Sequence, residues 1–203
     1  MLRNTLTRLG VLVTAAGLLT ACADQRSTPV GPAAAPTRAL TLATTLGRTA
    51  PLAQSVTTSA LIDSTGGTIR IAETGLTVEI PAGAVAQPTM ITATAIPGSS
   101  FAYEFGPHGT TFARPLVMHQ QLEGGRLGLL SRSTTLEIGY FASRSQLNAD
   151  GSEVLVNEFL PLQADVRDNR VRWQVTHFSG YVVSSGRGSR TSFSSPDSDG
   201  LGL

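Results

Sequence analysis

Several residue types are scarce or missing in this chain of 203 residues, and their scarcity narrows the functions open to it. Lysine is missing, so Schiff-base chemistry and a P-loop lysine are excluded. Cys22 is the single cysteine, so no disulfide forms within the chain and the fold must depend on its core. Aromatic residues make up 5% and charged residues 14%, without a basic run interleaved with aromatics. This composition gives no sign of a nucleic-acid partner.

The N-terminal residues have the pattern of an export signal. Arg3 and Arg8 precede a short apolar run, residues 9–19, which is shorter than the roughly 20 residues that a membrane-spanning helix needs. The next residues, LTAC, resemble the lipobox of bacterial lipoproteins, in which the Cys22 thiol takes a diacylglycerol. Ordinary cleavage within the small residues around Cys22 is the alternative. We expect residues 1–21 to be a lipoprotein signal peptide.

A lipidated Cys22 makes the membrane itself a partner of the chain. Two or more acyl chains anchor a protein stably, whereas one binds reversibly. Ala23 follows the cysteine and, by resemblance to lipoprotein sorting rules, does not signal retention in the inner membrane. We therefore expect an exported protein anchored to the bacterial envelope, with the outer membrane favoured.

Composition divides the rest of the chain into three parts. Residues 22–60 are rich in Pro, Ala, Thr and Ser without a clear period, which is typical of a disordered tether, although the leucines at 40, 42 and 46 leave a helical turn or an edge strand open. Residues 185–203 are rich in Gly and Ser and are expected to be a disordered tail. Residues 61–184 are long enough for one domain with its own core.

Apolar and polar residues alternate throughout residues 61–184. Alternating runs occur at residues 69–71, 76–80, 91–95, 136–138, 154–156 and 171–175. Turn residues separate them: Glu73-Thr74-Gly75, Pro81-Ala82-Gly83, Asn148 to Gly151, and Asp168-Asn169. Strict alternation buries one face of each strand. The sequence therefore predicts an all-β fold, an antiparallel β-sandwich.

Three blocks of this region resemble the ZU-5 domain family. They are GGTIRIAETGLTVEIPAGAV (residues 66–85), YEFGPHGTTFARPLVM (103–118) and THFSGYVV (176–183). The resemblance covers residues 61–184 and implies a ZU-5-like β-sandwich. The family's animal members are interaction modules, so the resemblance implies a non-enzymatic binding or structural role. The animal partners do not carry over to a bacterial lipoprotein, which leaves an unknown envelope protein or polymer as the expected partner.

The HFS tripeptide in the third block raises a second possibility. Some animal members of the family split their chain within HFS, and the resemblance places such a cut between Phe178 and Ser179. Ser179 Oγ would attack the Phe178 carbonyl while His177 takes the proton, and water would then hydrolyse the ester. This needs a distorted peptide bond, a polarised carbonyl, and His177 in contact with Ser179. The alternative is that residues 171–183 form one closing strand, in which His177 and Ser179 stand roughly 6.5 to 7 Å apart.

Other chemistry finds little support in the sequence. His108, His119 and His177 lie in different blocks without metal-ligand spacing, and the residues around Asp150 lack the ligand count of a calcium loop. Nucleophile-elbow, zinc-helix and dinucleotide-binding motifs are missing as well. We therefore expect a non-enzyme with no cofactor and no metal site.

Overall fold

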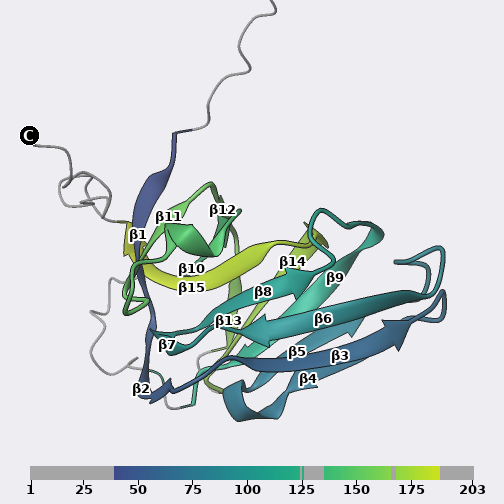
Figure 1. The fold of residues 1–203 in the computed structure, drawn as a ribbon, viewed down its shortest axis with the longest axis horizontal. Coiled ribbons are helices and arrows are strands. Elements are labelled where there is room, and N and C mark those ends of the chain that lie inside the picture. The colour runs from purple at the N-terminus through teal and green to yellow at the C-terminus, as the bar shows by residue number, and fades with distance from the viewer. Residues whose placement is uncertain (1–38, 124, 126–134, 166–167, 188–203) are drawn as a thin grey trace, which may run out of the picture. The chain divides into compact units, whose positions relative to one another are not determined.

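The computed structural model describes residues 39–123, 125, 135–165 and 168–187, and these residues form an all-β fold (Figure 1). The first seven strands are β1 (Thr41–Thr45), β2 (Gly47–Leu52), β3 (Val56–Ile62), β4 (Gly67–Ile71), β5 (Leu76–Ile80), β6 (Thr89–Ala95) and β7 (Gly98–Ser100). The other strands are β8 (Ala102–Gly106), β9 (Thr111–Gln121), β10 (Glu137–Phe141), β11 (Glu153–Val156), β12 (Glu158–Leu160), β13 (Gln163–Asp165), β14 (Arg170–His177) and β15 (Gly180–Arg187). Two short 3-10 turns, η1 (Ala72–Thr74) and η3 (Arg144–Gln146), are the helical segments of the described part.

The strands form two large antiparallel sheets, as the alternation predicts. The eight-stranded sheet has the order β11-β1-β15-β8-β6-β3, and β10 pairs with both β15 and β12. The five-stranded sheet has the order β13-β14-β9-β5-β4, and β2 forms a short separate pair with β7. The expected antiparallel fold is therefore confirmed.

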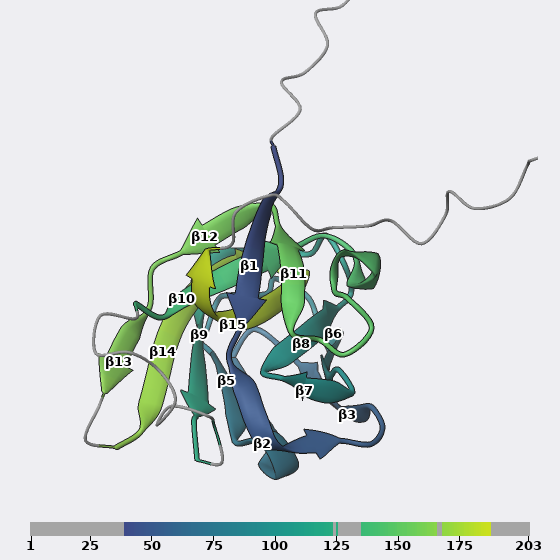
Figure 2. The same ribbon diagram turned by 90° about the vertical axis from the view of Figure 1, so that its left-hand side faces the viewer.

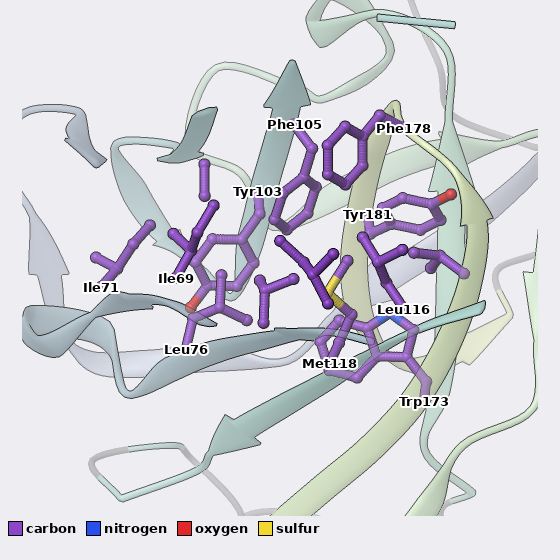
Figure 3. Close-up of a cluster of buried hydrophobic side chains, with 14 of the residues drawn as sticks. Ile69, Ile71, Leu76, Tyr103, Phe105, Leu116, Met118, Trp173, Phe178 and Tyr181 are labelled. Carbon is purple, nitrogen blue, oxygen red and sulfur yellow. The ribbon is translucent and has the colours of Figure 1, made fainter. Parts of the chain in front are cut away.

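One hydrophobic core lies between the two large sheets (Figure 3). The five-stranded sheet contributes Ile69, Ile71, Leu76, Leu116, Met118 and Trp173, and the eight-stranded sheet contributes Tyr103, Phe105 and Tyr181. None of these side chains is more than 3% exposed. Strand β14 shows the physical basis, because its residues alternate between buried and exposed along seven positions.

The central strand β15 is buried on both faces. Val183 belongs to the core between the sheets, whereas Val182 packs in a second apolar cluster with Phe141, Val154 and Val156. The run from Tyr181 to Val183 therefore does not alternate between apolar and polar residues. Apolar side chains of β11 and β12 pack in the cluster around Val182, on the side of β15 that faces away from the core between the sheets.

The turn that follows β5 has the structure that its residues predict. Strand β5 ends immediately before Pro81, which has no N–H to donate to the ladder. Gly83 has a φ of +76°, which glycine adopts without strain. Ala84 and Val85 then turn inward and are buried in the core.

The structure corrects the expected boundary between tether and domain. Residues 41–60, expected to belong to a disordered tether, form β1, β2 and most of β3. Strand β1 pairs with β11 on one side and with β15 on the other, so it lies inside the sheet (Figures 1 and 2). Leu42, Ala43 and Leu46 are 3% exposed or less. Their burial, together with the hydrogen bonds of two strand ladders, outweighs the weak β-propensity of a Thr- and Ala-rich segment.

The other expected boundaries fall partly outside the described residues. Strand β15 continues to Arg187, three residues past the expected end of the domain. The signal peptide, Cys22, the tether as far as residue 38, and the tail from residue 188 lie outside the described part of the chain.

Candidate functional site

The HFS tripeptide joins the two sheets and does not lie within one strand. Strand β14 ends at His177 in the five-stranded sheet, and β15 begins at Gly180 in the eight-stranded sheet. Phe178 and Ser179 form the link between them. This corrects the expected single closing strand over residues 171–183, because burying the apolar residues on both sides of the link requires the chain to change sheets.

The FGPHG loop between β8 and β9 holds this link through backbone hydrogen bonds. Phe178 N–H donates to the Thr110 carbonyl at 2.8 Å, and Gly109 N–H donates to the Phe178 carbonyl at 3.2 Å. Phe105 N–H donates to the Ser179 carbonyl at 3.0 Å. Two motifs that the sequence presents separately therefore form one structural unit, here called the HFS junction: residues 177–179 with residues 105–110.

Phe178 fills the space between the sheets at the HFS junction (Figure 3). Its ring stacks on Phe105 with centroids 5.4 Å apart and meets the edge of Phe112 at 4.6 Å. Phe105 at the start of the FGPHG loop and Phe112 just after it thus both contact Phe178. These are the offset and edge-to-face geometries that aromatic pairs prefer.

His177 contacts tyrosines and not Ser179. The Tyr181 hydroxyl donates to the His177 carbonyl at 2.7 Å and lies 3.3 Å from His177 Nδ1, and the Tyr140 ring meets the imidazole edge-on at 5.1 Å. Burial raises the pKa of Tyr181, and the nearby Tyr140 and Glu158 raise this pKa further. Tyr181 therefore stays a neutral donor at physiological pH, and its hydroxyl orients the end of β14.

Ser179 also makes a structural contact. Its Oγ donates to the Phe141 carbonyl at 3.2 Å, and the residue is 5% exposed. Within the described residues no hydrogen bond joins Ser179 to His177, and neither a cis peptide bond nor a positive φ falls at residues 178–179. Of the three conditions for cleavage, only the polarised carbonyl is met, and only in part, because one N–H group, that of Gly109, donates to the Phe178 carbonyl.

A buried polar chain crosses the core near β2. Arg48 donates from Nη2 to the Tyr103 hydroxyl at 3.0 Å, and Tyr103 donates to Gln120 Oε1 at 2.6 Å. Burial is the main cause that raises the pKa of Tyr103, with Arg48 opposing it. Arg48 is 5% exposed, its guanidinium lies 4.6 Å from the Phe101 ring centre, and its Nε and Nη1 have no hydrogen-bond partner. Sequence reasoning missed this network because Arg48 lies in the segment expected to be a tether.

The outer face of the five-stranded sheet carries an arginine cluster. Strand register places Arg70, Thr77, His119 and Arg172 side by side across β4, β5, β9 and β14. Arg170 lies two residues before Arg172 on the same face. We call Arg70, His119, Arg170 and Arg172 the arginine face.

Two shallow hollows of about 390 and 570 Å³ occupy the arginine face and share His119 and Arg170 as lining residues. Arg170 Nε donates to Gln121 Oε1 at 3.3 Å, whereas the side chains of Arg70 and Arg172 make no hydrogen bond or ion pair within the described residues. His119 Nε2 lies 3.3 Å from a Glu79 carboxylate oxygen without hydrogen-bond geometry. The hollows thus hold guanidinium donors that are free to meet a ligand.

The remaining residues singled out in the sequence do not gather into a site. His108 is exposed on the FGPHG loop, His119 lies in β9, and His177 ends β14. Among the described residues, no three His, Cys, Asp or Glu side chains come together as metal ligands. The described part also contains no helix with the length and apolar character of a membrane span.

Comparison with known proteins places part of the chain in a family. A search of curated proteins found no match. A family model does match, over residues 58–150, which covers the segment from β3 through the FGPHG loop to the turn before β11 and ends before the HFS tripeptide. Residues 58–150 of this chain are a ZU5 domain.

Proposed function

We propose that this protein is a lipoprotein of the bacterial envelope, anchored through Cys22, whose β-sandwich acts as a non-enzymatic interaction module. The anchor rests on the short apolar run and the LTAC motif that precede a single cysteine. The outer membrane is the favoured location, because Ala23 follows the cysteine.

The arginine face is the observation that carries the binding role. Arg70 and Arg172 stand exposed without a partner, on either side of Thr77 and His119, above two hollows. Guanidinium groups present forked donors that match carboxylate and phosphate oxygens. Glu79 and Asp165 also line the hollows, so the face offers three guanidinium groups against two carboxylates. The partner is therefore an envelope component that presents acidic groups.

Binding to envelope extract tests this role with charge-matched variants. Arg172→Gln, alone and combined with Arg70→Gln, removes donors from the arginine face. Arg144→Gln removes the same charge from the exposed η3 turn and serves as the control. Because a hydrogen bond to a charged group contributes about 1.5 kcal/mol, we expect about tenfold weaker capture for each arginine lost from the face. Equal capture by the Arg172 and Arg144 variants would contradict the proposal.

Self-cleavage between Phe178 and Ser179 is the second candidate, and the hydrogen bond from Gly109 N–H to the Phe178 carbonyl favours it. In this reaction Ser179 Oγ bonds to the carbonyl carbon, the peptide C–N bond breaks, and the proton passes by way of His177 to the new amine. Water then hydrolyses the ester. His177 would first have to leave the Tyr181 hydroxyl and turn toward Ser179.

The products of such a cut would stay together until they are denatured, because β15 pairs with β1, β8 and β10. Long incubation of purified protein followed by denaturing electrophoresis therefore tests it. Cleavage releases a fragment that begins at Ser179, and Ser179→Ala abolishes this fragment. An undivided band after incubation excludes the reaction, and this result leaves the binding role untouched.

A further inference from the structure

Strand β3 forms one free end of the eight-stranded sheet. All seven of its residues pair with β6, from Val56 with Ala95 to Ile62 with Thr89. Within the described part of the chain, no strand pairs with its other edge. That edge presents backbone N–H and C=O groups to its surroundings, and such a row is a template for another strand.

The other free edges of the sheets are short or charged, and β3 is neither. In the two large sheets, each of the other edge strands has five residues or fewer and carries a charged residue: Arg70 on β4, Glu153 on β11, Glu158 on β12 and Asp165 on β13. Strand β3 has seven residues, VTTSALI, without charge, proline or glycine. Natural edge strands are normally short, or carry a charge or a proline that hinders pairing with another chain. Strand β3 has none of these features, so its free edge can pair with another strand.

Among the described residues, the two most exposed large apolar side chains lie on β3 and on its neighbour β6. Leu61 is 64% exposed and Met90 is 54% exposed. They face each other directly across β3 and β6. This pair adds exposed apolar surface beside the unprotected edge, where a second strand would cover part of it.

We propose that β3 pairs antiparallel with β3 of a second copy of this chain, about a two-fold axis at Ser59. Ser59 is the middle residue of β3, so this register pairs all seven residues of each strand. Val56 then lies opposite Ile62 of the other copy, Thr57 opposite Leu61, and Thr58 opposite Ala60. The pairs join apolar side chains to each other or to a threonine, and no charge meets a like charge.

The symmetry explains why a second copy fits this edge better than an unrelated strand. A two-fold contact uses the same edge of both molecules, so each copy closes the free edge of the other. The two eight-stranded sheets then become continuous. A strand from a different protein would pair through one edge and leave its other edge open. Strand β3 also carries no charged group that would favour a particular foreign partner.

Cysteine cross-linking of the full chain, expressed in bacterial cells, tests the register. Ser59→Cys places two cysteines opposite each other, where paired strands bring Cα atoms within about 4.5 to 5.5 Å, a separation that a disulfide spans. Thr94→Cys is the matched control on β6, an inner strand. For Ser59→Cys we expect a dimer band that reductant removes. For Thr94→Cys we expect no such band.

Sedimentation of the purified chain in mild detergent supplies an independent readout. The unsubstituted chain and Ser59→Thr should double in mass as concentration rises. Ser59→Arg should remain monomeric with unchanged circular dichroism, because it sets two like charges directly opposite each other. An unsubstituted chain that stays monomeric at every concentration overturns the proposal and leaves the edge to a strand of another protein. A dimer that survives Ser59→Arg also overturns it, since another surface must then hold the copies together.

Discussion

Truncation of Phe178 measures how strongly the HFS junction holds the two sheets together. The side chain is 1% exposed and contacts the rings of Phe105 and Phe112. Phe178→Ala removes the ring from a site whose neighbours are fixed by strands β8 and β9. Such a truncation costs about 3–5 kcal/mol, and the loss of two aromatic contacts places this site near the upper end. Because a domain is stable by about 5–15 kcal/mol, the variant should lose a third or more of its free energy of unfolding.

Urea denaturation followed by tryptophan fluorescence measures this loss through Trp173, which is buried in the same core. Phe159→Ala is the control, because Phe159 is only partly buried and its ring contacts the Arg187 guanidinium at 4.3 Å. Phe178→Leu keeps most of the volume and gives a value if the alanine variant does not fold. A loss for Phe178→Ala below about 1 kcal/mol, or equal to that of Phe159→Ala, would show that the junction is not a structural anchor.

Three further substitutions test separate parts of the structure. Gly180→Ala places a Cβ inside the aromatic ring that packs on it from β10, so thermal melting should show a loss of about 1–3 kcal/mol or more, whereas Gly186→Ala, with no atom near its Cβ, should be close to neutral. Tyr103→Phe leaves Arg48 and Gln120 without the phenol hydroxyl as a hydrogen-bond partner. Chemical denaturation should show a free energy of unfolding lower by about 1–3 kcal/mol, and an unchanged midpoint would contradict this. The Thr65 hydroxyl and N–H hold the pKa of Asp63 below its usual value. Between the unfolded pKa of about 3.9 and the lower folded pKa, the unfolded state therefore binds more protons, and the free energy of unfolding decreases as the pH is lowered. Asp63→Asn should flatten this acid dependence in urea titrations at several pH values, and an unaltered slope would exclude the contribution.

The parts of the fold that the sequence predicts correctly are those set by neighbouring residues. The alternation of Val171, Trp173 and Val175 identifies β14 because a strand turns successive side chains to opposite faces. Pro81 and Gly83 mark the turn after β5 because each has a distinct backbone requirement. These signals need no knowledge of what the strand pairs with.

Pairing between distant segments escapes the same reasoning. Strand β1 has weak local character, and its stability comes from β11 and β15, more than 100 residues further along the chain. The unpartnered nitrogens of Arg48 are equally invisible in the sequence, because they depend on Phe101 and Tyr103 closing around the guanidinium. Burial of a tether-like segment is a tertiary effect.

The candidate site shows the same division. The tripeptide HFS and the FGPHG loop are both recognisable as motifs, but only the fold shows that Gly109 donates to the Phe178 carbonyl. The expectation that His177 and Ser179 lie on one strand is also wrong, because the chain passes from one sheet to the other between them. The contacts of His177 with Tyr140 and Tyr181 follow from that crossing.

Intact-mass spectrometry of the protein extracted from bacterial membranes tests the proposed anchored, non-enzymatic role most directly. We expect one species that begins at Cys22, carries a diacylglycerol on the cysteine sulfur, and continues unbroken across the Phe178–Ser179 bond. A chain without lipid on Cys22 would contradict the anchor, and a chain that ends at Phe178 would contradict the non-enzymatic role.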